Sequence, residues 1–205
     1  MRRPARHSIR RREPTQQRAQ ETVNAILDGV IRLLKHGGAS AISTNRIAEA
    51  AGVSIGSVYQ YFPNKRAIFV ALHERHVDHV DRVLLCKIRE SAGESLDRLV
   101  SNLMDGMVEL HASDPELAIL LDTEVPNRAD VAREFSLRLH EPLRKALAPH
   151  AETLGGLVKL DLRAFLFANL LDALGHAVVL RRPRALSQRH AKIEACKAIL
   201  AGLKT

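Results

Sequence analysis

Cysteine and aromatic residues are scarce in this chain of 205 residues. It has two cysteines, five phenylalanines, two tyrosines and no tryptophan. Two cysteines, Cys86 and Cys196, are too few for a disulfide framework or a cysteine-rich zinc site, and they suit a reducing compartment. So few aromatic side chains argue against a groove that stacks single-stranded bases and against an aromatic cage for a cationic ligand.

Long hydrophobic runs and the patterns of catalysis are also lacking. No segment has about 18 consecutive uncharged apolar residues, and no apolar stretch follows the basic N-terminus as it would in a signal peptide. We therefore expect a cytoplasmic protein without membrane contact. The sequence has no nucleophile elbow, glycine-rich phosphate loop or metalloprotease pattern. We expect no enzyme, no catalytic residues, no cofactor and no metal.

Positive charge is present, and it is confined to one third of the chain. The net charge is +8, and residues 1–66 contain twelve lysines and arginines against four acidic residues. The remaining 139 residues are therefore neutral overall. A basic module joined to a neutral one favours a polyanionic partner for the first and a different role for the second. A basic tail on an ordinary domain would give the same balance.

Hydrophobic residues recur with the period of an α-helix along almost the whole chain, which predicts an all-α fold of about nine helices. We expect a flexible basic arm at 1–15, a helix-turn-helix domain at 16–66 that runs into a linking helix at 65–89, and an effector-binding and dimerisation domain at 90–205. Turn signals at proline and glycine bound the expected helices, which lie at about 15–36, 44–51, 55–62, 65–89, 95–112, 115–122, 127–148, 157–181 and 186–203.

Residues 43–62, STNRIAEAAGVSIGSVYQYF, have the pattern of a helix-turn-helix unit. Gly52 tolerates a left-handed turn, and Ile47, Val58 and Phe62 supply a small core. The exposed face of the second helix carries small or hydrogen-bonding residues that can contact base edges and phosphates in a major groove. The candidate DNA contacts are Thr44, Asn45, Arg46, Ser54, Gly56, Ser57, Tyr59, Gln60, Tyr61 and Lys65. A helix pair that never touches DNA remains the alternative, and Arg46 could equally be solvated.

The pattern I-A-x-x-A-G-V-S-x-G-x-V-Y-x-Y-F-x-x-K over 47–65 resembles the N-terminal domain of TetR/AcrR-type transcriptional regulators. The resemblance covers about residues 15–80. It implies a homodimer whose short recognition helices enter successive major grooves of a palindromic operator in double-stranded DNA, and a larger domain that releases the DNA when a small molecule binds. It also implies DNA contacts by Thr44, Ser57, Tyr59, Tyr61 and Lys65. Ile55 stands where some members carry a polar or basic residue, which removes one possible base contact.

The last two expected helices, at 157–181 and 186–203, are the candidate dimer interface. Their apolar and small residues could form a four-helix bundle with the same helices of a partner copy. The candidate interface residues are Phe165, Asn169, His176, Ile193, Cys196 and Leu200. The alternative is that these residues fill an intramolecular core. For an unknown small-molecule effector, the candidate residues of an apolar cavity are Leu103, Met104, Met107, His111, Leu121, Phe135 and Leu139. The alternative, which is the commoner role for any one of them, is a core or surface residue.

Three histidines, His73, His76 and His79, follow one another at spacings of three. Neighbouring pairs share a helix face, but the three drift around the helix at about 100° per residue and do not converge on one ion. We interpret them as a polar helix face near phosphates, although a pair could bind a metal.

A repressor released from its operator by a small molecule is the function that these patterns favour. Two other functions remain open: a small-molecule-binding helical protein or enzyme with a vestigial DNA module, and a nonspecific architectural DNA binder driven by the basic arm.

Overall fold

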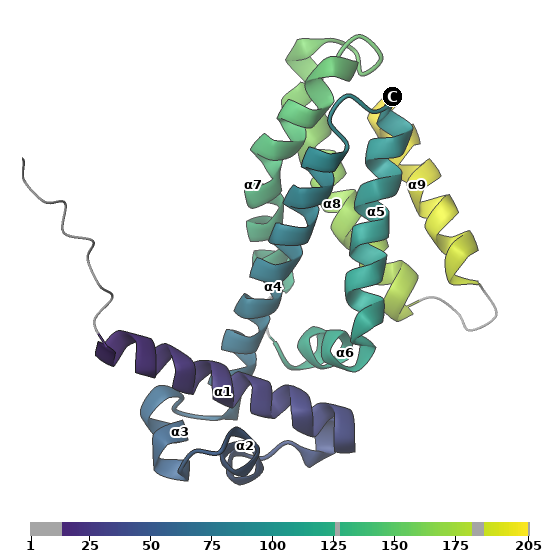
Figure 1. Ribbon diagram of the computed structural model, residues 1–205. Coiled ribbons are helices and arrows are strands. Elements are labelled where there is room, and N and C mark those ends of the chain that lie inside the picture. The colour runs from purple at the N-terminus through teal and green to yellow at the C-terminus, as the bar shows by residue number, and fades with distance from the viewer. Residues whose placement is uncertain (1–13, 126–127, 182–186, 205) are drawn as a thin grey trace, which may run out of the picture. The chain divides into compact units, whose positions relative to one another are not determined.

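Nine α-helices and no β-strand make up the part of the chain that is described, so the all-α prediction is confirmed (Figure 1). The structure is a computed structural model that describes residues 14–125, 128–181 and 187–204. It divides into two units between Ile68 and Phe69. The six arginines expected to act in the basic arm lie outside the described residues: Arg2, Arg3, Arg6, Arg10, Arg11 and Arg12.

The first unit contains α1 (Pro14–Gly37), α2 (Thr44–Ala51), α3 (Ile55–Tyr61) and the start of α4 (Lys65–Glu90). The side chains of Ser43 and Ser54 cap α2 and α3 by accepting hydrogen bonds from the backbone N–H of Arg46 and Ser57. A short core forms where the apolar stripes of these helices meet. Its members are Ile26, Leu27, Val30, Leu34, Ala41, Ile42, Ile47, Ala48, Val58 and Phe62, which are all buried.

Gly29 sets the distance between α1 and α2. A Cβ atom at this position would lie 3.1 Å from the carbonyl oxygen of Ile47 and 3.2 Å from the backbone nitrogen of Ala51. Both neighbours are backbone atoms of α2, which cannot rotate away as a side chain can. The glycine therefore permits the close approach of α1 and α2.

We expect Gly29→Val to destabilise the first unit by about 2–3 kcal/mol, because the added methyl groups force α1 and α2 apart. Chemical denaturation followed by circular dichroism measures the change. Gln20→Val, which places the same residue at an exposed position of α1, should cost less than about 1 kcal/mol. Equal effects at the two positions would show that helix propensity, not the close approach, is responsible.

The second unit contains most of α4 together with α5 (Leu96–Ser113), α6 (Pro115–Glu124), α7 (Arg128–Leu147), α8 (Leu160–His176) and α9 (Gln188–Lys204). Helix α8 contacts α5, α7 and α9. It contributes Ala164, Phe167, Ala168 and Leu171 to a single hydrophobic cluster that also includes residues of α4, α5, α7 and α9. The sequence-predicted helices correspond closely to these elements.

The segment expected as one helix at 157–181 has three parts. It begins with a 3-10 turn, η3 (Leu157–Lys159), continues as α8, and ends in a π-helical segment, η4 (Ala177–Arg181). By length and composition this run could cross a membrane, a test that core helices of soluble proteins also pass. Its inward residues lie in the hydrophobic cluster, which accounts for its apolar composition.

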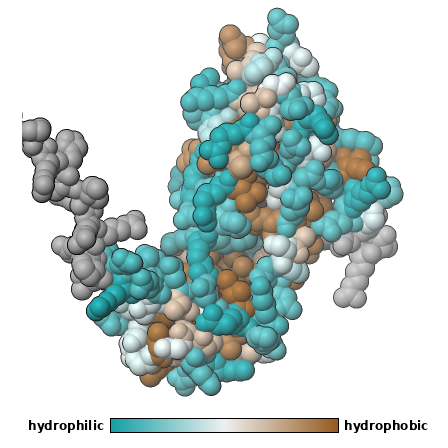
Figure 2. Space-filling model, viewed as in Figure 1, coloured by the Kyte–Doolittle hydropathy of each residue, from teal (hydrophilic) through white to brown (hydrophobic). Residues whose placement is uncertain are grey.

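The surface is mostly hydrophilic on the face drawn in Figure 2, with apolar residues in scattered groups. Several large apolar side chains are nevertheless exposed in the second unit. They include Phe165 at 50% and Leu162 at 55% on α8, and Ile193 at 38% on α9.

Arg138 connects α7 to α4 within the second unit. Its guanidinium donates to Asp81 at 2.9 Å, to Asp78 at 3.2 Å and to Glu134 at 2.9 Å. Partial burial raises the pKa of Asp81 against the opposing effect of Arg138. This network links α7 to the middle of α4.

Candidate functional site

The first candidate site is the exposed side of α2 and α3. Gly52 ends α2 with φ of 68°, a left-handed conformation, and the backbone N–H of Val53 bonds to the carbonyl oxygen of Ala48 at 3.0 Å. This turn lets Val58 and Phe62 bury against Ile47. The opposite side of α3 is consequently left at the surface.

The predicted DNA contacts lie at or near that surface. Tyr59 is 53% exposed, and its hydroxyl lies 3.4 Å from the hydroxyl of Thr44 at the start of α2. The exposed predicted residues are Asn45, Arg46, Ser54, Gly56, Tyr59, Gln60 and Lys65, and the half-buried ones are Thr44, Ser57 and Tyr61. The structure therefore brings residues from both helices to one surface that a major groove could accept.

Ser54 also stabilises the start of α3, whereas Gly56 has no comparable structural role. The Ser54 hydroxyl caps α3 and lies 2.8 Å from the Ser57 hydroxyl. A Cβ atom on Gly56 would meet only the Ser54 oxygen, at 3.7 Å. The absence of a side chain there therefore leaves the backbone of α3 open to close approach rather than relieving a clash.

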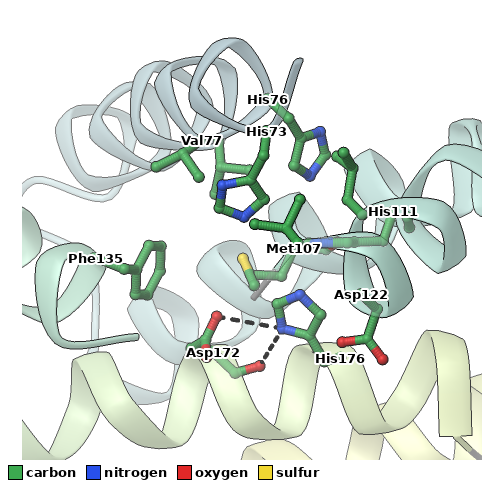
Figure 3. Close-up of a pocket in the computed structure, with 13 residues that line it drawn as sticks. His73, His76, Val77, Met107, His111, Asp122, Phe135, Asp172 and His176 are labelled. Carbon is green, nitrogen blue, oxygen red and sulfur yellow. Dashed lines mark hydrogen bonds and ion pairs between the residues drawn. The ribbon is translucent and has the colours of Figure 1, made fainter. Parts of the chain in front are cut away.

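The second candidate site is a cavity of about 70 Å³ within the second unit. Histidines from three helices surround it: His73 and His76 on α4, His111 on α5 and His176 on α8 (Figure 3). The apolar part of its wall is formed by Val77, Val80, Met107, Ala118, Leu121, Val125 and Phe135. Asp122 and Asp172 complete the lining.

Three imidazole rings follow one another across this cavity. The ring centroids of His76 and His111 are 5.5 Å apart, and those of His111 and His176 are 4.6 Å apart. Burial, reinforced by the neighbouring histidines, lowers the pKa of His76 to about 3. Burial and the nearby His176 lower the pKa of His111 to about 4. Both rings are therefore neutral at physiological pH.

Hydrogen bonds fix the tautomer of two rings. The Nδ1 atom of His111 lies 2.8 Å from the carbonyl oxygen of Met107, and the Nδ1 atom of His176 lies 2.9 Å from that of Asp172. Because a carbonyl oxygen only accepts, each Nδ1 must carry the proton. Because His111 is neutral, its Nε2 atom is then a hydrogen-bond acceptor.

The predicted effector residues divide between the cavity and the core. Met107, His111, Leu121 and Phe135 line the cavity. Leu103, Met104 and Leu139 are not part of the lining; they lie in the buried cluster one helical turn along from Met107 and Phe135, which belong to both. The helical period identifies the inward face of α5 and α7, but it does not say at which level along that face the packing leaves a space.

Sequence reasoning missed most of the polar lining. The interpretation of the α4 histidines as a polar face near phosphates is wrong for His73 and His76, which line the cavity, whereas His79 is exposed. The available signal was the set of histidines at helical spacing together with His111 and His176. Among the described residues no group of three histidine, cysteine or acidic side chains could hold a metal ion.

The predicted interface residues do not share one environment. Phe165 and Ile193 are exposed. Cys196 and Leu200 are half-buried and pack against the core of their own unit. Asn169 donates to the Ser136 hydroxyl at 2.9 Å and to the Phe165 carbonyl at 2.8 Å. His176 lines the cavity.

Comparison with known families accounts for both units. Residues 26–72 match the model of bacterial regulatory proteins of the tetR family, and residues 95–203 match the tetracyclin repressor-like C-terminal domain. The second match alone spans more than half of the chain. This chain belongs to the TetR family. TetR-family membership explains why a helix-turn-helix precedes a larger helical domain.

Two curated relatives match this chain over 60 and 62 residues. The transcriptional regulator AcrR of Shigella flexneri is 43% identical over 60 residues, 29% of this chain and 28% of AcrR. The transcriptional repressor KstR of Rhodococcus jostii is 34% identical over 62 residues, 30% of this chain and 29% of KstR. The matched segments thus cover less than a third of these two relatives.

Solved TetR-family structures share the fold along nearly the whole chain. A TetR-family regulator from Streptomyces coelicolor superimposes with a TM-score of 0.60 at 23% identity, over 89% of this chain and 99% of that one. The fatty acid degradation regulator FadR from Bacillus halodurans has a TM-score of 0.59 at 20% identity, over 95% and 99% of the two chains. These likenesses concern the fold.

Proposed function

We propose that this TetR-family chain is a sequence-specific DNA-binding transcriptional regulator, a cytoplasmic repressor that leaves a palindromic operator when a small molecule binds. The observation that carries the proposal is the exposed side of α3, where Tyr59 and Gln60 project from a helix anchored by Val58. The net charge of +8 within residues 1–66 supports it, because phosphate contacts dominate DNA affinity.

Fluorescence anisotropy with the DNA next to the chain's own gene tests this function. We expect that DNA to bind at least ~10³-fold tighter than a scrambled duplex at physiological salt. A nonspecific architectural binder would hold both duplexes equally, with the same steep salt dependence. A helical protein with a vestigial DNA module would bind neither.

A homodimer is part of the proposal, because one helix-turn-helix contacts too few base pairs for useful specificity. Half-sites one helical turn apart, about 34–36 Å, require two α3 helices from two copies. The exposed apolar residues on α8 and α9, Phe165 and Ile193 among them, support this assignment.

We expect Phe165→Glu to dissociate the dimer, because it places a charge in an apolar interface. Sedimentation velocity at micromolar concentration measures the change from dimer to monomer. Leu137→Glu, at an apolar position on α7 that is even more exposed, at 68%, is the control and should remain dimeric. A wild-type monomer at this concentration would contradict the proposed dimer.

The effector role is proposed for the histidine-lined cavity. Its apolar wall with a few convergent polar groups is typical of small-molecule sites. The cavity lies entirely within the second unit, and its lining comes from helices α4 to α8. In this proposal the first unit binds DNA and the second unit binds the effector.

A further inference from the structure

A groove of about 510 Å³ lies between the C-terminal parts of α4 and α7, within the second unit. It is separate from the histidine-lined cavity, because the two have no lining residue in common. Its volume falls in the range of roughly 300–1,000 Å³ that is typical of small-molecule sites. The apolar part of its wall is formed by Leu85, Ile88, Ala92, Pro142, Ala146 and Pro149.

The apolar wall of this groove continues the hydrophobic core to the surface. Leu85, Ile88 and Ala146 are only partly buried, and they pack against the hydrophobic cluster of the second unit. Covering such apolar area with another apolar group removes it from water, which is favourable. The groove can therefore hold the apolar body of a ligand without any rearrangement of the core.

Two cationic side chains of the lining, Arg89 on α4 and Lys145 on α7, lie at the same level of the groove. The two helices run in the same direction (Figure 1), and the ion pair between Arg138 and Asp81 fixes how they are aligned. Lys145 follows Arg138 by seven residues, and Arg89 follows Asp81 by eight. At 1.5 Å per residue, both positions lie roughly 10–12 Å beyond that ion pair. A single head group in the groove can therefore meet both cations.

The charges around the groove favour an anion. Glu141 is the one acidic residue among the lining residues. Arg144 holds its carboxylate at 2.8 Å, closer than Lys145 does at 3.5 Å. The negative charge of Glu141 is therefore already matched by Arg144, which is not part of the lining. The guanidinium of Arg89 is exposed and has no ion pair with another described residue. Arg89 and Lys145 thus leave an excess of positive charge at one level of the groove.

A carboxylate is the head group that suits this pair of cations. The planar guanidinium of Arg89 can donate two parallel hydrogen bonds to the two oxygens of one carboxylate. Lys145 adds a mobile positive charge on the opposite helix. Both cations face solvent, so each contributes modestly, and the apolar wall supplies most of the affinity. The ligand must therefore combine an apolar body with an anionic end.

From this geometry we propose that the groove between α4 and α7 is a second ligand site. It takes an amphipathic carboxylate, with the head group between Arg89 and Lys145 and the apolar body against Ile88 and Pro142. The site is distinct from the histidine-lined cavity, and it depends neither on the proposed effector role of that cavity nor on DNA binding.

Methyl NMR of the full chain, labelled at isoleucine and methionine, tests the site and the ligand class. Ile88 lines the groove, Met107 lines the histidine cavity, and Ile199 is buried in the core as an internal control. Octanoate, 1-octanol and octylamine share one alkyl chain and differ in the head group. We expect octanoate to shift the Ile88 signal saturably, with a dissociation constant in the low millimolar range for so small a ligand. Octylamine should bind at least ~5-fold more weakly than octanoate.

A double variant with Arg89→Gln and Lys145→Gln separates charge from shape. Glutamine keeps a polar side chain of similar length but has no charge, so octanoate affinity should fall by ~3- to 10-fold while 1-octanol affinity stays unchanged. The matched control combines Arg98→Gln and Lys197→Gln, which remove two exposed positive charges of the second unit outside the lining. It should leave all three affinities unchanged. Raising the salt concentration from about 0.1 M to 1 M should weaken octanoate binding to the wild type.

Several outcomes would overturn the inference. Octylamine binding as tightly as octanoate would show that the groove does not select an anion. Equal octanoate affinities in the wild type and in the Arg89→Gln, Lys145→Gln variant would show that these cations do not bind the head group. No saturable Ile88 shift up to ~20 mM octanoate, or a shift of Met107 with Ile88 unmoved, would place no ligand in the groove. Anisotropy with DNA judges the DNA-binding role separately.

Discussion

Replacing Tyr59 and Lys65 together by alanine should weaken operator binding by about 10²–10³-fold. Both residues are exposed, and in the proposed complex both contact phosphates beside the major groove. Each charge-assisted or hydroxyl–phosphate bond contributes about 1–3 kcal/mol. Anisotropy titration measures the loss. Removal of Lys65 should also reduce the slope of log K against log salt by about one.

Two control variants define what the double substitution removes. Lys145→Ala takes away one exposed positive charge on α7 in the second unit, and it should leave operator affinity within about twofold. Tyr59→Phe keeps the ring and removes the hydroxyl, which also lies 3.4 Å from Thr44. It should account for part of the loss. Undiminished binding by the double variant would contradict the assigned contacts.

The second unit should be about 2–4 kcal/mol less stable at pH 5 than at pH 7.5 through its buried histidines. The pKa of His76 is lowered to about 3 and that of His111 to about 4, whereas both rings titrate near 6.5 when unfolded. Between those values the unfolded chain binds more protons, so stability rises with pH. The stability that the two neutral histidines contribute is complete above about pH 6.5 and is lost progressively as the pH falls below that value.

Urea unfolding of the full chain at the two pH values measures this difference. His76→Asn should reduce the difference by about 2 kcal/mol, whatever its effect at a single pH, because one titrating ring is gone. His79→Asn, at an exposed position three residues along the same helix, should leave it nearly unchanged. An unaltered pH dependence in His76→Asn would mean that His76 is not held neutral by burial.

Local patterns allowed most of the fold to be predicted from the sequence. Gly52 and the serine caps at Ser43 and Ser54 mark helix ends by chemistry that acts within a few residues. The family pattern over 47–65 likewise pointed to the exposed side of α3. The need for Gly29 depends on how close α2 lies to it, which no local pattern encodes.

The cavity could be predicted only in part for the same reason. Helical periodicity placed Met107 and His111 on an inward face, but Leu103 shares that face and lies in the core. His73 and His76 have polar side chains, which single-helix reasoning assigns to solvent. Both are half-buried because they line a cavity together with residues of α5 and α8, helices far away in the sequence, and the ring of His76 lies edge-on to that of His111.

Selection of bound duplexes from a random DNA pool tests the central claim most directly. Repeated capture by the full chain should enrich a palindrome whose half-sites lie one helical turn apart. The enriched duplex should bind at least ~10³-fold tighter than the starting pool at physiological salt. A pool without a shared sequence after selection, bound no better than random DNA, would contradict the proposal that this TetR-family chain is a sequence-specific regulator.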